Sequence, residues 1–450
     1  MSAANPKKQI GLLTLNDFHK AVAESRITLV APALVDMWGC LKGKYLAADT
    51  FVDQIARGAA GEACAYLLAS DVTMAPLNTY DLTGWDQGFQ DIGLRPDLET
   101  IRLMPHTPNL ALVHCDAIDS NGKPLSVDPR QMLRRQLDLL KTYDDYDAHI
   151  GLEHEFLLSS DGRPLTPGNA DYALNHHPRL HDFFKKTEEA LFIADTPIEA
   201  IKTEGAPGQI EVTFPYGPAM RACDNFTVYQ QTMQHLAAEF GWNINVMAAP
   251  QTGTGSGLHL HLSLWQDGEP AFSDVGGKRL PPPLEHAIGG LLACMPELAP
   301  LWAPFPNSYK RYRPHSFAPL FMNWGDDNRG CAVRMVGHGR GRHLELRMAG
   351  ADANSYLVAT AACASIRYGL LHKIKPSPPC TGDAYSDLGS TPIHRDLSEA
   401  LRHFTTAGGF PIDALGSDVV NHYAAAAQHE LDVHRELVTD VERERGGNHA

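Results

Sequence analysis

The 450-residue sequence lacks any apolar run near the roughly 20 residues that a membrane-spanning helix needs. Its N-terminal segment, Met1–Ile10, contains no apolar stretch of the signal-peptide kind, so we expect a cytoplasmic protein without a membrane partner. The eight cysteines include no Cys-x-x-Cys pair, which argues against a disulfide framework and against a zinc knuckle. Positive charge is also scarce, and the formal net charge of −15 argues against nucleic acid as the main partner.

The sequence also lacks the common nucleotide-binding loops. Its glycine-rich stretch Gly253–Gly257 (GTGSG) is not followed by Gly-Lys-Ser/Thr, and it runs into a predicted strand instead of a helix. Walker and Rossmann loops both hold phosphates at the N-terminus of a helix, so neither fits here. Any nucleotide must bind to another scaffold.

Apolar residues make up 44% of the chain and charged residues 20%, as in soluble proteins with a large core. Turn residues and β-rich runs predict a small mixed unit that ends near Asp119, with a loop over Asn78–Pro96. Its predicted elements are a helix at Leu15–Glu24 and strands at Ile27–Asp36, Lys44–Ala48 and Leu110–Asp116.

The rest of the chain predicts alternating strands separated by helices. A helix is expected at Asp128–Tyr143, because Asp128 suits the N-cap and Pro129 suits the first turn. Four segments with strand alternation follow: Gly151–Leu157, Gly208–Phe214, Gly257–Leu264 and Arg342–Met348. The predicted helices between and after them are Arg179–Ala194, Met220–Phe240, Pro283–Leu298 and Tyr356–His372.

The four alternating segments gather acidic and imidazole side chains on one face, because a strand sends alternate residues to opposite sides. For one segment alone, a solvent-exposed face explains the pattern. The four together carry Glu and His with scarcely any Lys, and crowded carboxylates repel one another unless a cation neutralises them. A divalent ion held by carboxylate and imidazole ligands removes this conflict. The polar residues of this predicted metal site are Glu153, Glu155, Glu211, His259, His261, Glu345 and, as a cation, Arg347.

A second set of candidates is basic and consists of Arg311, Arg329, Arg334 and Arg347. The planar guanidinium of arginine suits carboxylate and phosphate groups. Each arginine alone is equally consistent with a surface ion pair. Together with carboxylate-bound metal, they indicate phosphoryl transfer, in which catalysis is mainly positioning and charge neutralisation.

From about Ile27 onward, the order and spacing of six motifs resemble those of the type I glutamine synthetase superfamily. The motifs are Gly151–Phe156 (GLEHEF), Glu204–Glu211 (EGAPGQIE), Gly255–His261 (GSGLHLH), Asn307–Arg311 (NSYKR), Asn328–Arg334 and Glu345–Tyr356. The resemblance implies an α+β protein with an N-terminal β-grasp domain (residues 1–119). The second domain (residues 120–450) would be a catalytic domain like those of glutamine synthetases and guanidino kinases, with an antiparallel sheet. It also implies a homo-oligomer of stacked hexameric rings.

The same resemblance assigns roles to individual residues. The expected metal ligands are Glu155, Glu204 and Glu211 for an ion near glutamate, and Glu153, His259 and Glu345 for an ion that bridges the phosphates of ATP. The implied ions are Mg²⁺ or Mn²⁺, two or three per site. The expected catalytic residues are Arg311, Arg329 and Arg347, of which Arg311 and Arg347 also bind glutamate. Gly255 corresponds to a glutamate contact, and the nucleotide contacts are His261, Ser263, Arg329 and Arg334.

The sequence departs from ammonia-using members at the second substrate. Phe317 stands where their Asn-Ser-Tyr-Lys-Arg motif is followed by a glutamate that deprotonates ammonium. Ammonium needs anionic or polar partners, which a phenyl ring does not supply, so Phe317 favours an amine with apolar bulk. The pattern resembles γ-glutamylpolyamine and other γ-glutamylamide synthetases, which implies an ATP-dependent ligase for glutamate and an amine. An ammonia-using enzyme, in which Phe317 only packs a lid, and a non-catalytic family member remain alternatives.

Overall fold

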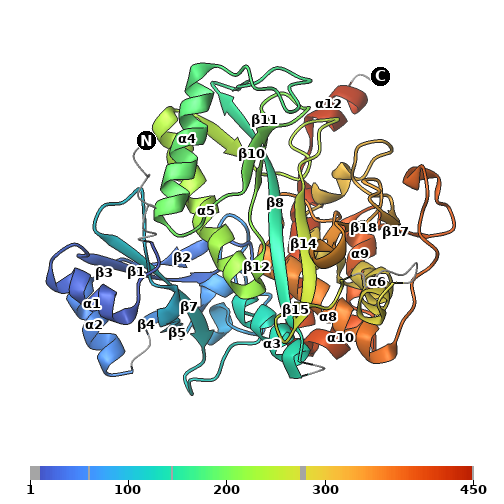
Figure 1. Cartoon of the computed structure of the whole chain (residues 1–450). Coiled ribbons are helices and arrows are strands. Elements are labelled where there is room, and N and C mark those ends of the chain that lie inside the picture. The colour runs from blue at the N-terminus through green and yellow to red at the C-terminus, as the bar shows by residue number, and fades with distance from the viewer. Residues whose placement is uncertain (1–10, 59–60, 143–144, 274–279, 448–450) are drawn as a thin grey trace.

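The computed structural model describes residues 11–58, 61–142, 145–273 and 280–447 (Figure 1). Two sheets organise the chain. The first lies at the lower left of Figure 1, and the second runs through the middle of the molecule. No helix within the described residues is long and apolar enough to cross a membrane.

The first sheet has its strands in the order β2-β1-β7-β5-β4, with β3 beside β1 and β6 beside β7. Strands β1 and β7 run parallel, and the other pairs are antiparallel. Helices α1 (Leu15–Ala23) and α2 (Ala48–Ala56) belong to the same unit, and Phe18 and Phe51 meet edge to face in its core. The strands are β1 (Leu29–Val35), β2 (Leu41–Gly43), β3 (Leu46–Ala47), β4 (Gly61–Cys64), β5 (Asp91–Pro96), β6 (Arg102–Leu103) and β7 (Leu110–Ile118).

Two predictions in this unit are wrong. The predicted loop Asn78–Pro96 ends in strand β5, where Ile92 and Leu94 are buried and alternate with more exposed residues. The many Gly, Asp and Asn residues before β5 hid this short alternation. The predicted strand Lys44–Ala48 shrinks to the two residues of β3, because α2 already begins at Ala48.

The second sheet has the order β10-β11-β8-β14-β19-β18-β17, and only its last pair is parallel. Short strands β9, β12 and β13 also pair with β8, and β15 pairs with β14. Its strands are β8 (Asp147–Ser160), β9 (Arg163–Pro164), β10 (Ala200–Thr203), β11 (Gln209–Thr213), β12 (Gly217–Pro218), β13 (Asn243–Asn245), β14 (Leu258–Gln266), β15 (Glu269–Pro270), β17 (Trp324–Asp326), β18 (Val333–Val336) and β19 (His343–Leu346). A separate small pair joins β16 (Phe321–Met322) to β20 (Thr391–Pro392).

Helices cover the apolar face of the second sheet, where Leu152 of β8 lies directly opposite Leu260 of β14. Both leucines are buried, and α3 and α5 contact β8 while α8 contacts β14. The helices of this part are α3 (Pro129–Thr142), α4 (Pro178–Ile193), α5 (Ala219–Phe240), α6 (Pro282–Cys294), α7 (Ala299–Trp302), α8 (Ser355–His372), α9 (Leu397–Phe404), α10 (Phe410–Leu415), α11 (Ser417–Glu436) and α12 (Asp440–Gly446).

The predicted helices of this part are all present. Asp128 caps α3 as expected, because its Oδ1 accepts the backbone N–H of Arg130 at 2.9 Å. The predicted last residue of this helix, Tyr143, lies outside the described residues.

Candidate active site

Strand register gathers the predicted acidic and imidazole residues on one face of the second sheet. Glu155 of β8 lies opposite Glu211 of β11, and Glu153 lies opposite His259 of β14. On the other side of β14, His261 lies opposite Glu345 of β19. Directly paired residues of antiparallel strands project to the same face, so the strands bring these groups together. This is the face that the helices leave uncovered.

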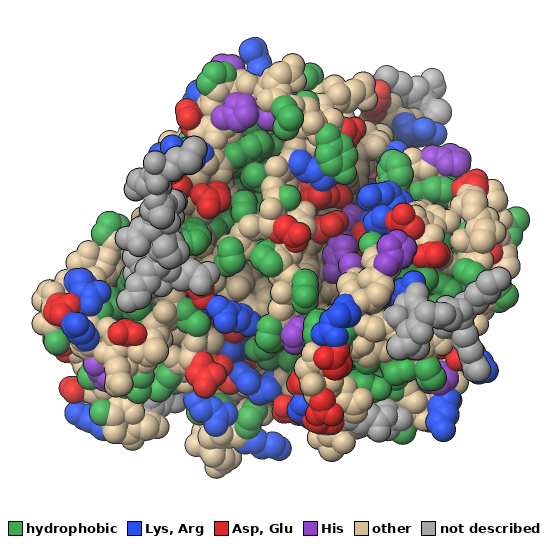
Figure 2. All heavy atoms as spheres, in the orientation of Figure 1, with side chains coloured by type: hydrophobic (Ala, Val, Ile, Leu, Met, Phe, Trp, Pro, Cys, Tyr) green, Lys and Arg blue, Asp and Glu red, His purple; other side chains and the backbone are tan. Residues whose placement is uncertain are grey.

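A cavity of about 910 Å³ opens over this face. Figure 2 shows acidic and histidine side chains near the middle of the view, over β8 and β14, with basic side chains beside them. The cavity lining includes eleven of the predicted residues: Glu153, Glu155, Glu204, Glu211, His259, His261, Ser263, Phe317, Arg329, Arg334 and Arg347. Glu345 is fully buried, and Gly255 and Arg311 lie beside each other outside the lining.

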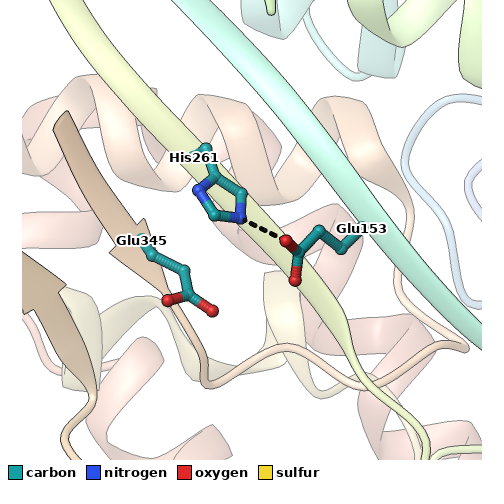
Figure 3. Close-up of side chains that lie close together, drawn as sticks. All are labelled: Glu153, His261 and Glu345. Atoms are coloured by element: carbon teal, nitrogen blue, oxygen red, sulfur yellow. Dashed lines mark ion pairs between the residues drawn. The ribbon is translucent and has the colours of Figure 1, made fainter. Parts of the chain in front are cut away.

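Glu153, His261 and Glu345 point toward one another from three neighbouring strands (Figure 3). One potential ligand atom of each lies within 4.8 Å of the other two, the one such group that the described residues contain. The Nε2 atom of His261 is 3.1 Å from Oε1 of Glu153. Two carboxylates and an imidazole at this spacing fit a divalent ion of the Mg²⁺ or Mn²⁺ kind.

His259 lies in the same cluster. Its Nδ1 atom is 3.1 Å from Oε2 of Glu153 and 3.5 Å from Oε1 of Glu345. Burial raises the pKa of Glu153, but the hydrogen bonds to His259 and His261 outweigh burial, and the pKa falls well below its usual range. Both histidines therefore support an ionised Glu153, and the choice of His259 over His261 as the ligand stays a prediction.

Glu345 is surrounded by cations. Its Oε2 atom accepts Nη1 of Arg334 at 2.8 Å, and its Oε1 atom is in contact with Nη1 of Arg347. Burial raises the pKa of Glu345, but Arg347 and the nearby His259 and His261 outweigh burial and lower the pKa to about 2. This carboxylate is therefore ionised at neutral pH even though no solvent reaches it.

The arginines fall into two groups. Arg329, Arg334 and Arg347 line the cavity, and the Nε of Arg347 donates to the backbone oxygen of Arg329 at 3.0 Å. Arg311 is buried, and its Nη1 donates to the backbone oxygens of Arg347 and Met348, each at 3.1 Å. Arg311 thus holds the backbone that carries Arg347, and its Nη2 lies 3.4 Å from Nε2 of His259 in the cavity lining.

The second predicted group of metal ligands, Glu155, Glu204 and Glu211, does not fit a metal in the same way. Oε2 of Glu155 accepts the backbone N–H of Gly257 at 2.9 Å. Between Glu204 and Glu211 lies the ammonium group of Lys202, in contact with Oε1 of Glu204 and 3.1 Å from Oε1 of Glu211. Burial and the nearby Glu153 raise the pKa of Glu211 in spite of Lys202. Sequence reasoning missed this lysine.

One end of the cavity is aromatic, which sequence reasoning also missed. Ring centroids of His149 and Trp265 are 5.0 Å apart with a stacked orientation, and those of Tyr216 and Trp265 are 6.3 Å apart. Ser263 lies directly opposite His149, and its hydroxyl accepts Nε1 of Trp265 at 2.9 Å. The continued alternation from Ser263 to Trp265 on one strand was the available signal.

Phe317 lies on the loop after Arg311, and its side chain is 66% exposed at the cavity. Its φ of 60° is rare for a bulky residue, so the neighbouring contacts must hold this conformation. The backbone oxygen of Phe317 accepts Nη2 of Arg347 at 3.4 Å, and Oγ of Ser316 donates to the backbone oxygen of Arg313 at 2.7 Å. The loop thus presents a phenyl ring next to the arginines.

Comparison with known proteins places this site in a family. The model of the glutamine synthetase catalytic domain matches residues 126–446. The chain therefore belongs to the glutamine synthetase family. It is 36% identical to a gamma-glutamylethanolamide synthetase (GlnA4) of Streptomyces coelicolor, over 96% of this chain and 95% of that protein. It is 30% identical to a glutamate–isopropylamine ligase of Pseudomonas sp, over 99% of both chains.

A solved structure of GmaS in complex with ADP has the same fold. It superimposes with a TM-score of 0.85 at 23% identity and covers 96% of this chain and 100% of the GmaS chain. A similarity at this level of identity concerns the fold, a mixed helix and sheet architecture of the glutamine synthetase kind.

Proposed function

We propose that this protein is an ATP-dependent ligase that joins the γ-carboxylate of glutamate to an amine larger than ammonia. The observation that carries the proposal is the shared cavity, in which a carboxylate and imidazole cluster lies beside Arg329, Arg334 and Arg347. The names of the relatives in Streptomyces coelicolor and Pseudomonas support the same class of reaction.

ATP would lie with its base against the aromatic end of the cavity, because flat rings stack on Tyr216 and Trp265 and Ser263 offers a polar contact. The phosphates would then extend toward Arg329 and Arg334. Divalent ions, Mg²⁺ or Mn²⁺, would be held by the Glu153 cluster and would offset the charge of the transferring phosphoryl group. Two or three ions per site, with Glu155, Glu204 and Glu211 as the ligands of a second ion, are also part of the proposal, as the family resemblance implies.

In the proposed reaction, an oxygen of the γ-carboxylate of glutamate attacks the γ-phosphorus of ATP, and ADP leaves. Arg347, fixed by Glu345 and by the backbone of Arg329, orients the carboxylate and the phosphoryl group. The nitrogen of a neutral amine then attacks the acyl carbon, phosphate leaves, and the amine loses one proton. Phe317 covers this step and excludes water, which would otherwise hydrolyse the acyl phosphate.

The proposal that the second substrate is an amine larger than ammonia rests on Phe317. An exposed phenyl ring at the cavity offers apolar contact to a carbon substituent and offers no carboxylate to hold ammonium. An alkyl amine, a polyamine or an aryl amine fits this surface better than ammonia does.

A panel of amines tests the proposal. ADP release is measured at saturating glutamate and ATP with ammonia, ethanolamine, isopropylamine, putrescine and an aryl amine, and products are identified by mass. We expect at least one substituted amine to exceed ammonia by roughly tenfold in kcat/KM, the effect of about 1.4 kcal/mol of apolar contact. Phe317→Glu should shift the ratio back toward ammonia, whereas Leu388→Glu, an exposed change outside the cavity, should not.

The panel separates the alternatives. If ammonia outperforms every larger amine, the protein is an ammonia-using glutamine synthetase and the role given to Phe317 is wrong. If no amine and no ammonia supports glutamate-dependent ADP release, the protein is a non-catalytic member of the family.

The architecture beyond the observed sheets also belongs to the proposal. We place a β-grasp domain at residues 1–119 and the catalytic domain at 120–450, in line with the first sheet, which uses no residue after Ile118. We further propose a cytoplasmic homo-oligomer of stacked hexameric rings, with glutamate, ATP and an amine as its small-molecule partners.

A further inference from the structure

Lys202 occupies an unusual place for a lysine in this cavity. It lies on β10 directly opposite Glu211 of β11, and its side chain is 21% exposed. The Nζ atom contacts Oε1 of Glu204 and lies 3.1 Å from Oε1 of Glu211. The same atom lies 4.8 Å from the ring centroid of Tyr172. Two carboxylates and an aromatic face thus surround one ammonium group.

This arrangement places a positive charge where the proposed function expects a divalent ion. An ammonium group is a compact charge with three donors, so it can satisfy two carboxylates at once. The ring of Tyr172 adds a third favourable contact for a cation. A metal ion between Glu204 and Glu211 would meet the charge of Lys202 at short range and would have to displace it.

The other carboxylate cluster differs in this respect. In the Glu153 cluster, Arg334 and Arg347 pair with Glu345, but the ion-pair partners of Glu153 itself within the described residues are His259 and His261. An ion there can be held through Glu153 and an imidazole, whereas an ion between Glu204 and Glu211 has to displace Lys202. Neutral imidazole is itself a metal ligand and need not leave when an ion enters. The two clusters should therefore differ in their affinity for a divalent ion.

We propose that Lys202 is a built-in cation that holds the place of a divalent ion between Glu204 and Glu211. The ligand-free protein then binds one divalent ion strongly, at the Glu153 cluster, and a second only in competition with Lys202. This inference rests on the proposed function, because that function makes Glu204 and Glu211 metal ligands.

Direct Mn²⁺ binding tests the inference without any turnover. The full-length protein is titrated with Mn²⁺ alone, without ATP or glutamate, and free Mn²⁺ is followed by electron paramagnetic resonance. We expect one strong site per chain in the unmodified protein. Lys202→Met should bind a second ion at least tenfold more tightly than the unmodified protein does, a change of about 1.4 kcal/mol. Lys202→Arg keeps the charge and should behave like the unmodified protein.

Lys141→Met is the matched control. Lys141 also bridges two carboxylates, those of Asp145 and Asp147 at 2.7 and 2.9 Å, but it lies outside the cavity. This variant should leave Mn²⁺ binding unchanged. Circular dichroism and thermal melting check that each variant is folded, and Lys202→Gln replaces Lys202→Met if the methionine variant does not fold.

The outcomes are distinct for the inference and for the proposed function. The unmodified protein could bind two Mn²⁺ ions with equal affinity, and Lys202→Met could bind them in the same way. This result would overturn the role of Lys202 but would not contradict the proposed ligase activity. A single Mn²⁺ site in both proteins also overturns the role of Lys202, because removal of the lysine then creates no second site. The absence of any Mn²⁺ site, combined with ADP release that does not depend on divalent ions, overturns the metal assignment itself.

Discussion

At the scale of single residues, Glu345 links the metal cluster to the arginines. Its side chain is fully buried, yet it contacts Arg334, Arg347 and His259. Because its pKa is lowered to about 2, it supplies a fixed negative charge to all three neighbours. Loss of that charge would leave two guanidinium groups without a shared partner and free Arg347 from its orientation.

The change Glu345→Gln tests this role while it keeps the shape of the side chain. We expect glutamate-dependent ADP release to fall by at least ~100-fold in kcat, as for the loss of a group that organises charge around a reacting centre. Steady-state kinetics at saturating substrates measure the effect. Glu62→Gln, an exposed change on β4, is the control and should keep full activity. Normal turnover by a folded Glu345→Gln protein would contradict the proposed site.

At the scale of elements, helix α3 carries a buried ionic connection between the first sheet and helix α5. Arg130 is buried and donates from Nη1 to Asp116 of β7 at 2.6 Å and from Nη2 to Asp97 at 2.7 Å. Its Nε also donates to Asp224 of α5 at 2.9 Å. Burial lowers the pKa of Arg130, but Asp224 and the other acidic neighbours outweigh burial and raise it. One guanidinium group therefore joins the first sheet, α3 and α5.

Replacement of Arg130 by Met should destabilise the protein strongly, because three carboxylates would lose their shared cation in a buried place. We expect a loss of about 3–5 kcal/mol in the free energy of unfolding, measured by urea denaturation. Arg134→Met is the matched control on the same helix, since Arg134 lies 3.4 Å from Asp97 and 3.5 Å from Asp116 but is 37% exposed. The control should lose less than about 1 kcal/mol. Equal losses in both variants would show that burial of Arg130 does not matter.

The elements differ in how well the sequence alone predicts them. The segments around Glu153, Glu211, His259 and Glu345 were predictable, because each alternates strictly and its apolar side must face a core. Short elements such as β5 and α2 were not predictable from the sequence, because turn-forming residues surround them and tertiary packing decides their conformation.

The pairing register between strands limited how much of the site could be predicted from the sequence. Lys202 shares a face with Glu204, but its position opposite Glu211 depends on how β10 pairs with β11, which a single sequence does not reveal. The role of Arg311 as a substrate contact stays a prediction from its motif, and the sequence did not reveal that its side chain also donates to backbone oxygens of Arg347 and Met348. A motif predicts which residue types meet, and packing decides which of them reach the cavity.

At the scale of the whole molecule, the contact between the first sheet and the helices contains buried histidines. His114 of β7 lies 2.9 Å from the hydroxyl of Thr227 on α5. His422 of α11 packs against Tyr80, with ring centroids 4.4 Å apart. Burial lowers the pKa of each histidine to about 4. For His114, burial together with Arg102 and Arg130 outweighs the acidic Asp224 and Asp97, which raise the pKa. Both histidines are neutral in the folded protein at neutral pH.

This contact should weaken in acid. An unfolded histidine has a pKa of about 6.5, so between pH 6.5 and pH 4 the unfolded chain binds protons that the folded chain does not. Stability from each histidine is therefore complete above pH 6.5 and is lost as the pH falls toward 4, by roughly 3 kcal/mol per buried group. Thermal melting between pH 7.5 and pH 4.5 should show a falling midpoint. His422→Phe keeps an aromatic ring beside Tyr80 and removes one titrating group, so its midpoint should fall less steeply than that of the unmodified protein.

His434→Phe changes an exposed histidine of the same helix and should keep the original slope. If His422→Phe and the unmodified protein lose stability in parallel over this range, His422 does not couple folding to pH, and the acid sensitivity of the contact must come from another buried histidine such as His114.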